Sequence, residues 1–311
     1  MQSSSYPYIR LNAHKNVTNG VIIAGNEGRG RAGENTSEED GKYITNEALQ
    51  FVCASLLSVS GLIILIMIAN GNWKELLFPL VTTIPSAVVS GSSQRGVVPD
   101  GAPTTSFRDM TLFSEISDTG ASISVGYSIA AFCLISGVAE FAAMGVMIAY
   151  KETEFPSTMR FLEYSVTASI MQVVICVQLG IWDWRALMGI VGLTITCMLC
   201  GIIGEMNIEK DQPTAWLAFG TGCVAFFFTW AQVFANFYDT WAKNADAPAF
   251  IWAIVFVEFF LFALFGLVQF LQILSGEGNH EQVTRRYIAL SIASKMVLAW
   301  VVVSQVLANK T

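Results

Sequence analysis

The sequence predicts an all-α membrane protein, a bundle of seven transmembrane helices with a long loop between the first two. The first observation is the composition, because 53% of the 311 residues are hydrophobic and only 13% are charged, which is too apolar for an ordinary soluble domain. The second is that seven stretches stay apolar over about 20 residues, the length that crosses the hydrocarbon core of a bilayer. These stretches are about 46–70, 121–150, 158–181, 185–207, 214–239, 248–274 and 283–308.

Two segments lie outside the seven spans. Residues 1–45 form a tail that is Gly-rich around "GNEGRGRAGEN" and lacks apolar periodicity, so we expect it to be disordered. The loop at about 70–120 contains the β-prone runs "LVTTIPSAVVS" and "TTSFRDMTLF", with prolines and glycines between them. These runs predict a small external strand pair. The chain then divides into a tail, 1–45, and one membrane domain, 46–308.

The first apolar run begins near Phe51, so we expect no cleavable signal peptide, and the first span acts as its own insertion signal. Seven spans put the termini on opposite sides of the membrane, and Lys and Arg are enriched on the cytoplasmic side. Short loops on the N-terminal side carry Lys151, Arg160, Lys210, Arg285 and Arg286, whereas the other side carries Arg185, Lys243 and Lys310. We therefore expect a cytoplasmic N-terminus, an extracellular C-terminus and an extracellular 70–120 loop.

Charge and cysteine content argue against several other classes of protein. The net charge of −7 comes mostly from the tail and loops, and no basic patch is present to bind nucleic acid. All six cysteines lie in predicted spans, where they pack as small apolar side chains. Cys197 and Cys200 form a C-x-x-C without a nearby His or further Cys, which is a weak metal signal. We expect membrane lipid as the surroundings, and neither a metal site nor an enzymatic activity.

Five ionisable residues lie well within the spans: Glu140, Glu163, Glu205, Glu258 and Lys295. A charge near the centre of a span costs about 2.5 to 3.5 kcal/mol on insertion scales, so each residue needs a partner, a neutral state or a function. Lys295 is the only base among them. Its presence alone leaves three interpretations open: a structural ion pair, a substrate or ion site in a transporter, and covalent attachment of an aldehyde as a Schiff base.

Glu163 is the candidate partner of Lys295. Glu163 lies seven residues after Pro156 and Lys295 lies ten residues after Arg285. At 1.5 Å per residue, they lie about 10 and 15 Å from the cytoplasmic ends of the third and seventh spans, a difference that a lysine side chain can bridge. Ser291, one turn before Lys295, can place its hydroxyl beside the lysine nitrogen or its counterion.

For each of the other three carboxylates within the spans, two roles are open. Glu205 either ends the fourth helix at the membrane interface or joins a polar network on the cytoplasmic side, where Arg160 also lies. Glu140 is either a buried structural carboxyl or a member of that network, and Glu258 either pairs with another helix or faces a second copy of the chain. The aromatic runs "AFFFTW" and "FVEFFLFALF" of the fifth and sixth spans are dense enough to line a flat polyene pocket, although such runs more often pack or contact lipid.

Two segments together resemble the heliorhodopsin family. In "RFLEYSVTASIM", Arg160 to Met171, an Arg and an aromatic residue precede a Glu-Tyr pair, and a Ser/Thr/Ala-rich stretch ends in Met. In "LSIASKMVLAW", a serine lies four residues before the lysine and Leu-Ala-Trp follows it. The resemblance covers about 46–308. It implies a seven-helix, rhodopsin-like retinal protein of inverted orientation, usually a homodimer, whose external loop helps to form the dimer face.

The resemblance also implies roles for single residues. Lys295 matches the lysine that attaches all-trans retinal as a protonated Schiff base, Glu163 the counterion, Ser291 the serine beside the Schiff base, and Met171 a residue of the retinal pocket. Thr167, one turn after Glu163, faces the same pocket by helical periodicity. Glu205 falls at the spacing of a carboxylate that family members carry on the fourth helix.

The sequence departs from the family in its histidines. Heliorhodopsins often place histidines on the first two helices, in a polar cytoplasmic cavity, whereas the only histidines here are His14 and His280. Glu140 is therefore a candidate for part of that polar role.

The resemblance implies a photosensory or regulatory protein with a slow photocycle, which also requires a downstream signalling partner. An ionised Glu163 favours a positive charge on Lys295. Polar groups are sparse beyond Lys295, which argues against a standard ion pump. The alternative is a light-activated proton or ion channel or transporter that uses Glu140, Glu205 and Glu258, and a third hypothesis is a retinal-free transporter or receptor.

Overall fold

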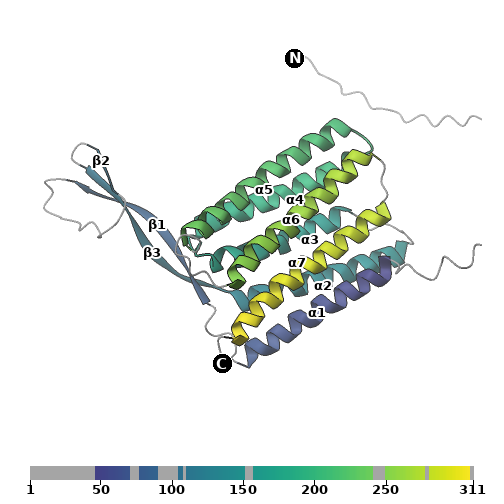
Figure 1. The fold of residues 1–311 in the computed structure, drawn as a ribbon, viewed down its shortest axis with the longest axis horizontal. Coiled ribbons are helices and arrows are strands. Elements are labelled where there is room, and N and C mark those ends of the chain that lie inside the picture. The colour runs from purple at the N-terminus through teal and green to yellow at the C-terminus, as the bar shows by residue number, and fades with distance from the viewer. Residues whose placement is uncertain are drawn as a thin grey trace, which may run out of the picture. The chain divides into compact units, whose positions relative to one another are not determined.

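A computed structural model describes residues 46–70, 77–89, 104–107, 110–150, 157–240, 249–276 and 280–308. Figure 1 shows the helices of this part of the chain gathered into one bundle, with the strands at one end of it. The tail at 1–45, which we predict to be disordered, lies outside the described residues.

The described residues form seven helices that are long and apolar enough to cross a membrane, which confirms the predicted fold class. They are α1 (Asn46–Ala69), α2 (Val125–Tyr150), α3 (Ser157–Gln178), α4 (Trp184–Asn207), α5 (Gln212–Thr240), α6 (Ala249–Ser275) and α7 (His280–Ala308).

Predicted boundaries of the second and third spans differ from the structure for identifiable reasons. Residues 121–124, which we assigned to the second span, belong to a strand that runs directly into α2. The segment is apolar enough to extend a hydropathy window, but it pairs with another strand of the same loop. The third span was predicted to reach residue 181, whereas α3 ends at Gln178. Gly180 then adopts a φ of 89°, a left-handed conformation that glycine reaches without a Cβ clash and that commonly ends helices.

The helices close into a ring. Each helix packs against the next one in the sequence, and α7 packs against α1. α3 also contacts α6, and 61% of its membrane-spanning stretch is buried, against 28–50% for the other six. Side chains on α3 therefore face the interior from several directions, and this helix carries most of the site described below.

The loop between α1 and α2 forms a three-stranded antiparallel sheet with the order β1-β3-β2. Its strands are β1 (Leu77–Val89), β2 (Thr104–Phe107) and β3 (Met110–Ser124). The long β1–β3 ribbon, which pairs Leu77 with Ser124 and Val89 with Met110, confirms the predicted strand pair. The second predicted run is divided between β2 and the start of β3, which pair with each other.

The sheet is fastened to the turn between α3 and α4. The Val81 N–H donates to the carbonyl of Trp182 at 2.9 Å, and the Trp184 ring N–H donates to Thr82 Oγ1 at 2.7 Å. Asp183 is the N-cap of α4 and accepts from the backbone N–H groups of Arg185, at 2.8 Å, and Thr83, at 3.0 Å. Burial raises the pKa of Asp183, but the hydrogen bonds together outweigh it and hold the pKa below its ordinary value.

Candidate functional site

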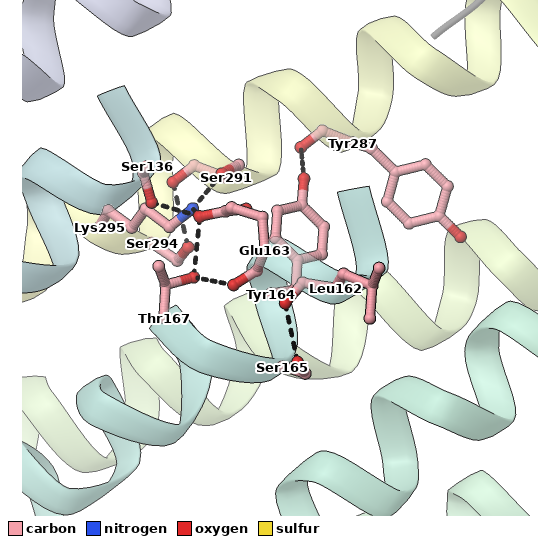
Figure 2. Close-up of polar contacts among 10 residues, drawn as sticks. All are labelled: Ser136, Leu162, Glu163, Tyr164, Ser165, Thr167, Tyr287, Ser291, Ser294 and Lys295. Carbon is pink, nitrogen blue, oxygen red and sulfur yellow. Dashed lines mark hydrogen bonds and ion pairs between the residues drawn. The ribbon is translucent and has the colours of Figure 1, made fainter. Parts of the chain in front are cut away.

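Lys295 lies inside the bundle on α7, with 3% of its surface exposed. Its Nζ lies 2.9 Å from Glu163 Oε1 on α3 and 2.8 Å from Ser291 Oγ, one turn earlier on α7. Figure 2 shows these side chains converging from the two helices. Nζ also lies 5.0 Å from the centre of the Tyr164 ring, close enough for a cation–π contact. The structure therefore brings together the three residues that the sequence analysis placed at the centre of the site.

Glu163 receives further hydrogen bonds from two other side chains. Thr167 Oγ1 donates to Glu163 Oε1 at 2.9 Å, and Ser136 Oγ on α2 donates to the same oxygen (Figure 2). Oε1 thus accepts from α2, α3 and α7 at once. Such an arrangement stabilises an ionised carboxylate beside a buried cation.

A cavity of about 350 Å³ has Lys295 of this ion pair on its wall. Lys295 and Ser291 lie on its wall together with Thr167 and Met171. Aromatic side chains of α3, α5, α6 and α7 supply much of the remaining wall: Phe161, Tyr164, Phe226, Phe262, Phe265 and Tyr287. The cavity is mostly apolar, its volume is typical of small-molecule sites, and it has one amine on its wall.

The aromatic runs of the fifth and sixth spans serve two purposes. Phe226, Phe262 and Phe265 line the cavity, whereas Phe227 and Phe260 are 65% and 62% exposed on the outside of the bundle. Helical periodicity separates the two sets, because neighbouring residues point in different directions. Gly201 of α4 admits the ring of Phe161 to the cavity wall, since a Cβ at Gly201 would lie 2.5 Å from that ring.

A second buried ion pair lies where α3 begins and α4 ends. Arg160 Nη2 donates to both carboxylate oxygens of Glu205, at 2.8 and 3.1 Å, and the two side chains are 4% and 8% exposed. Glu205 lies in the last turn of α4, but its side chain is directed inward and does not simply end the helix at the interface. The Arg160 guanidinium lies 4.3 Å from the centre of the Tyr287 ring on α7, and Tyr164 Oη donates to the Tyr287 carbonyl at 3.3 Å.

Glu140 and Glu258 are buried as well, and the structure shows no hydrogen bond from either to Lys295 among the described residues. Glu140 follows Ser136 by one turn of α2 and is 6% exposed. Glu258 is fully buried on α6, so the suggestion that it faces a second copy of the chain is wrong. His280 is the first residue of α7, fifteen positions before Lys295, and His14 lies outside the described residues.

Three residues of the site were missed by the sequence analysis: Ser136, Tyr164 and Tyr287. Ser136 and Glu140 are polar residues four apart in an otherwise apolar span, a spacing that marks one helix face and was a usable signal. For the two tyrosines no such signal exists, because their contacts depend on how α3 and α7 are rotated against each other.

The fold is similar to that of solved rhodopsins. The chain superposes on the crystal structure of Exiguobacterium sibiricum rhodopsin with a TM-score of 0.52 at 12% identity, covering 84% of this chain and 96% of that one. It superposes on a thermophilic rhodopsin with a TM-score of 0.56, also at 12% identity, covering 86% and 97%. The molecule therefore has the seven-helix fold of the microbial rhodopsins.

The family is defined by the sequence itself. Residues 104–307 match the heliorhodopsin family model, and the chain belongs to the heliorhodopsin family. No curated protein sequence matches the chain. Membership in this family implies a retinal chromophore and therefore a light-sensing protein. The seven apolar helices of the described residues make it an integral membrane protein. The cavity fits that chromophore, because it is apolar, is lined by aromatic rings and has the amine of Lys295 on its wall.

Proposed function

We propose that the chain is a photosensory or regulatory protein with a slow photocycle, in which Lys295 holds all-trans retinal as a protonated Schiff base and Glu163 is the counterion. The observation that carries this proposal is the buried contact of 2.9 Å between Lys295 Nζ and Glu163 Oε1 on the wall of an aromatic cavity. Bound retinal supplies light absorption and a change of shape on isomerisation.

The protein's own residues then have defined tasks. Glu163 balances the positive charge on the Lys295 nitrogen, and Ser136 and Thr167 hold the carboxylate in place. Ser291 accepts a hydrogen bond from the nitrogen, which fixes the direction of the N–H. Met171 and the aromatic rings give the cavity a mostly apolar wall, and apolar surroundings strengthen the electrostatic contacts beside it.

A chain of contacts supports a signalling role. Lys295 lies over the Tyr164 ring, Tyr164 bonds the backbone of Tyr287, and the Tyr287 ring packs against Arg160, which is paired with Glu205. A change of charge at Lys295 therefore acts on groups that join α3, α4 and α7 at the end of the bundle opposite the sheet. Local charge changes of this kind bias helix packing in other switches.

The attachment is tested with the visible spectrum of purified protein after addition of all-trans retinal. We expect a visible band in the wild type, no such band in Lys295→Ala, and an unchanged band in Lys210→Ala, which removes an exposed lysine outside the cavity. A band that survives unchanged in Lys295→Ala would refute the attachment. Flash photolysis of the same samples then measures the length of the photocycle.

Light-activated proton or ion transport is the second candidate, favoured by the buried carboxyls of Glu140 and Glu258. Voltage-clamped cells distinguish the two functions. The sensory proposal predicts an intact photocycle without photocurrent, whereas conduction predicts a photocurrent that disappears in Glu163→Gln.

We also propose a cytoplasmic N-terminus and a homodimer that uses the sheet. The distribution of Lys and Arg supports the orientation, and Ile116 on β3, which is 72% exposed, supplies apolar surface for a second copy. Accessibility of tags at the two termini of intact cells tests the orientation. Crosslinking at Ile116→Cys, compared with the wild type, tests the dimer.

A further inference from the structure

Glu258 is a carboxyl that the proposed function leaves unused. It lies on α6 and is 0% exposed. Neither Oε1 nor Oε2 has a hydrogen-bond partner among the residues that the structure describes. Buried carboxyl oxygens are almost always hydrogen-bonded, so two unpartnered oxygens on one side chain require an explanation.

The residues one turn from Glu258 on its face of α6 are apolar. The buried residues on the same stripe of α6 include Ile254 and Val255, and the core cluster that contains them also contains Leu298 of α7 and Val174 of α3. The two buried cations that the structure describes, Lys295 and Arg160, are already paired with Glu163 and Glu205. An ionised Glu258 would therefore be an uncompensated buried charge, which is far more costly than a neutral carboxylic acid.

Glu258 also lies close to the retinal cavity. Phe262, one turn further along the same face of α6, is part of the cavity wall. Glu258 is nine residues from the sheet-side end of α6, and Lys295 is thirteen residues from the sheet-side end of α7. At 1.5 Å per residue, Glu258 lies about 6 Å nearer the sheet side than Lys295, whereas the Arg160–Glu205 pair lies toward the opposite end.

We propose that Glu258 is a second proton-binding site, a neutral carboxylic acid on the sheet side of the retinal cavity. Its two unpartnered oxygens cost far less free energy in the neutral acid than in the ionised carboxylate. Through Phe262, the hydrogen bonding of this acid responds to changes in the cavity. The response to light rests on the proposed attachment of retinal to Lys295, but the presence of the proton does not.

Infrared spectroscopy tests the proton directly. In protein labelled with ¹³C at the glutamate side-chain carboxyl, we expect the carbonyl stretch of a protonated acid in the dark, and a shift of this band in D₂O. The band should be lost in Glu258→Gln and retained in Glu140→Gln, which changes the other buried carboxyl with an unpartnered oxygen. Protein prepared without retinal should show the same band, so this part of the test does not depend on the proposed function.

Illumination tests the coupling. We expect a shift of the Glu258 carbonyl band in the light-minus-dark spectrum of pigmented wild type, and loss of that feature in Glu258→Gln. A dark band that persists unchanged in Glu258→Gln overturns the proton site, and a dark band that does not respond to light in an otherwise active pigment overturns the coupling. If Glu258→Gln does not fold, Glu258→Asp is the second variant, because it keeps a carboxyl group at this position. Glu258→Asp should change the frequency of the carbonyl band. An unchanged frequency would again overturn the assignment of the band to Glu258.

Discussion

At the scale of single residues, the charge balance of the site depends on Glu163. Its Oε1 accepts hydrogen bonds from Lys295, Thr167 and Ser136. One carboxylate oxygen therefore balances the positive charge of Lys295 and is held in place by side chains of α7, α3 and α2. Ser136 and Thr167 add no charge. Their contribution is to hold the carboxylate where its distance to Lys295 stays short, which matters because a buried pair gains only from good geometry.

Glu163→Gln should move the visible band of the pigment to shorter wavelength at neutral pH. Glutamine keeps the size of the side chain but removes its charge, so the buried cation on Lys295 loses its partner and tends to lose its proton. Absorption spectra of wild type and variant measure the effect. Glu140→Gln is the matched control, because it neutralises a buried carboxyl that forms no hydrogen bond or ion pair with Lys295 Nζ among the described residues. An equal shift in both variants would contradict a specific role of Glu163.

At the scale of elements, the packing of α1 on α2 depends on a glycine. A Cβ at Gly137 would lie 2.2 Å from Ser58 Oγ and 3.1 Å from the Ala54 carbonyl oxygen of α1. A side-chain hydroxyl can rotate away, but the backbone oxygen can move only if the helices separate. The two helices therefore approach more closely at this position than any residue with a Cβ would allow.

Gly137→Ala should lower the stability of the bundle by about 1–3 kcal/mol, the usual cost of overpacking a tight interior. The measurement is the thermal stability of the purified protein, followed by circular dichroism. Gly145→Ala on the same helix is the control, because no atom lies within 4 Å of its added Cβ. There the substitution should leave stability unchanged or raise it by about 0.5–1 kcal/mol through helix propensity.

The sheet is fastened to the α3–α4 turn by an ionised group, so this connection should weaken in acid. The folded-state pKa of Asp183 lies below the ordinary value of 3.8. The ionised carboxylate therefore contributes stability above that value, and the contribution is lost as the pH falls through the folded pKa.

Asp183→Asn tests this directly. The difference in thermal midpoint between wild type and Asp183→Asn should be largest near neutral pH and should shrink below about pH 3.8. A difference that stays constant down to the lowest pH would show that the charge of Asp183 does not support the sheet.

At the scale of the whole molecule, the Arg160–Glu205 pair joins α3 to α4 and contacts α7 through Tyr287. Both side chains are almost fully buried, so removal of one partner leaves an uncompensated charge. The pair thus holds together three helices at the end of the bundle opposite the sheet, near the cytoplasmic surface of our proposed orientation.

Arg160→Met and Glu205→Leu should each destabilise the protein by about 3–5 kcal/mol, whereas the double variant should lose much less than the sum of the two. The reason is that the double variant leaves no unpaired buried charge. Thermal unfolding of the four proteins in one detergent measures the coupling. Additive losses would mean that the two residues act independently and would contradict the pairing.

The sequence by itself determined the number of spans, the β-prone loop between the first two, and the pairing candidates Lys295 and Glu163. These follow from local properties, namely the length of apolar segments, the cost of a charge in hydrocarbon and depth counted along two helices. The roles of these two residues as retinal attachment and counterion remain predictions, as does the disorder of the tail.

Only the tertiary structure decided how the helices are rotated and which side chains meet. In the structure Ser136 donates a hydrogen bond to Glu163, and Tyr164 donates one to the backbone of Tyr287. Glu205 pairs with Arg160. Glu258 is buried in the bundle and does not face a second copy of the chain. The tertiary structure also assigned residues 121–124 to a strand, because residues 122–124 pair with β1, whereas their local composition suits either structure. Such contacts join residues up to 123 positions apart in the chain, so no local pattern contains them.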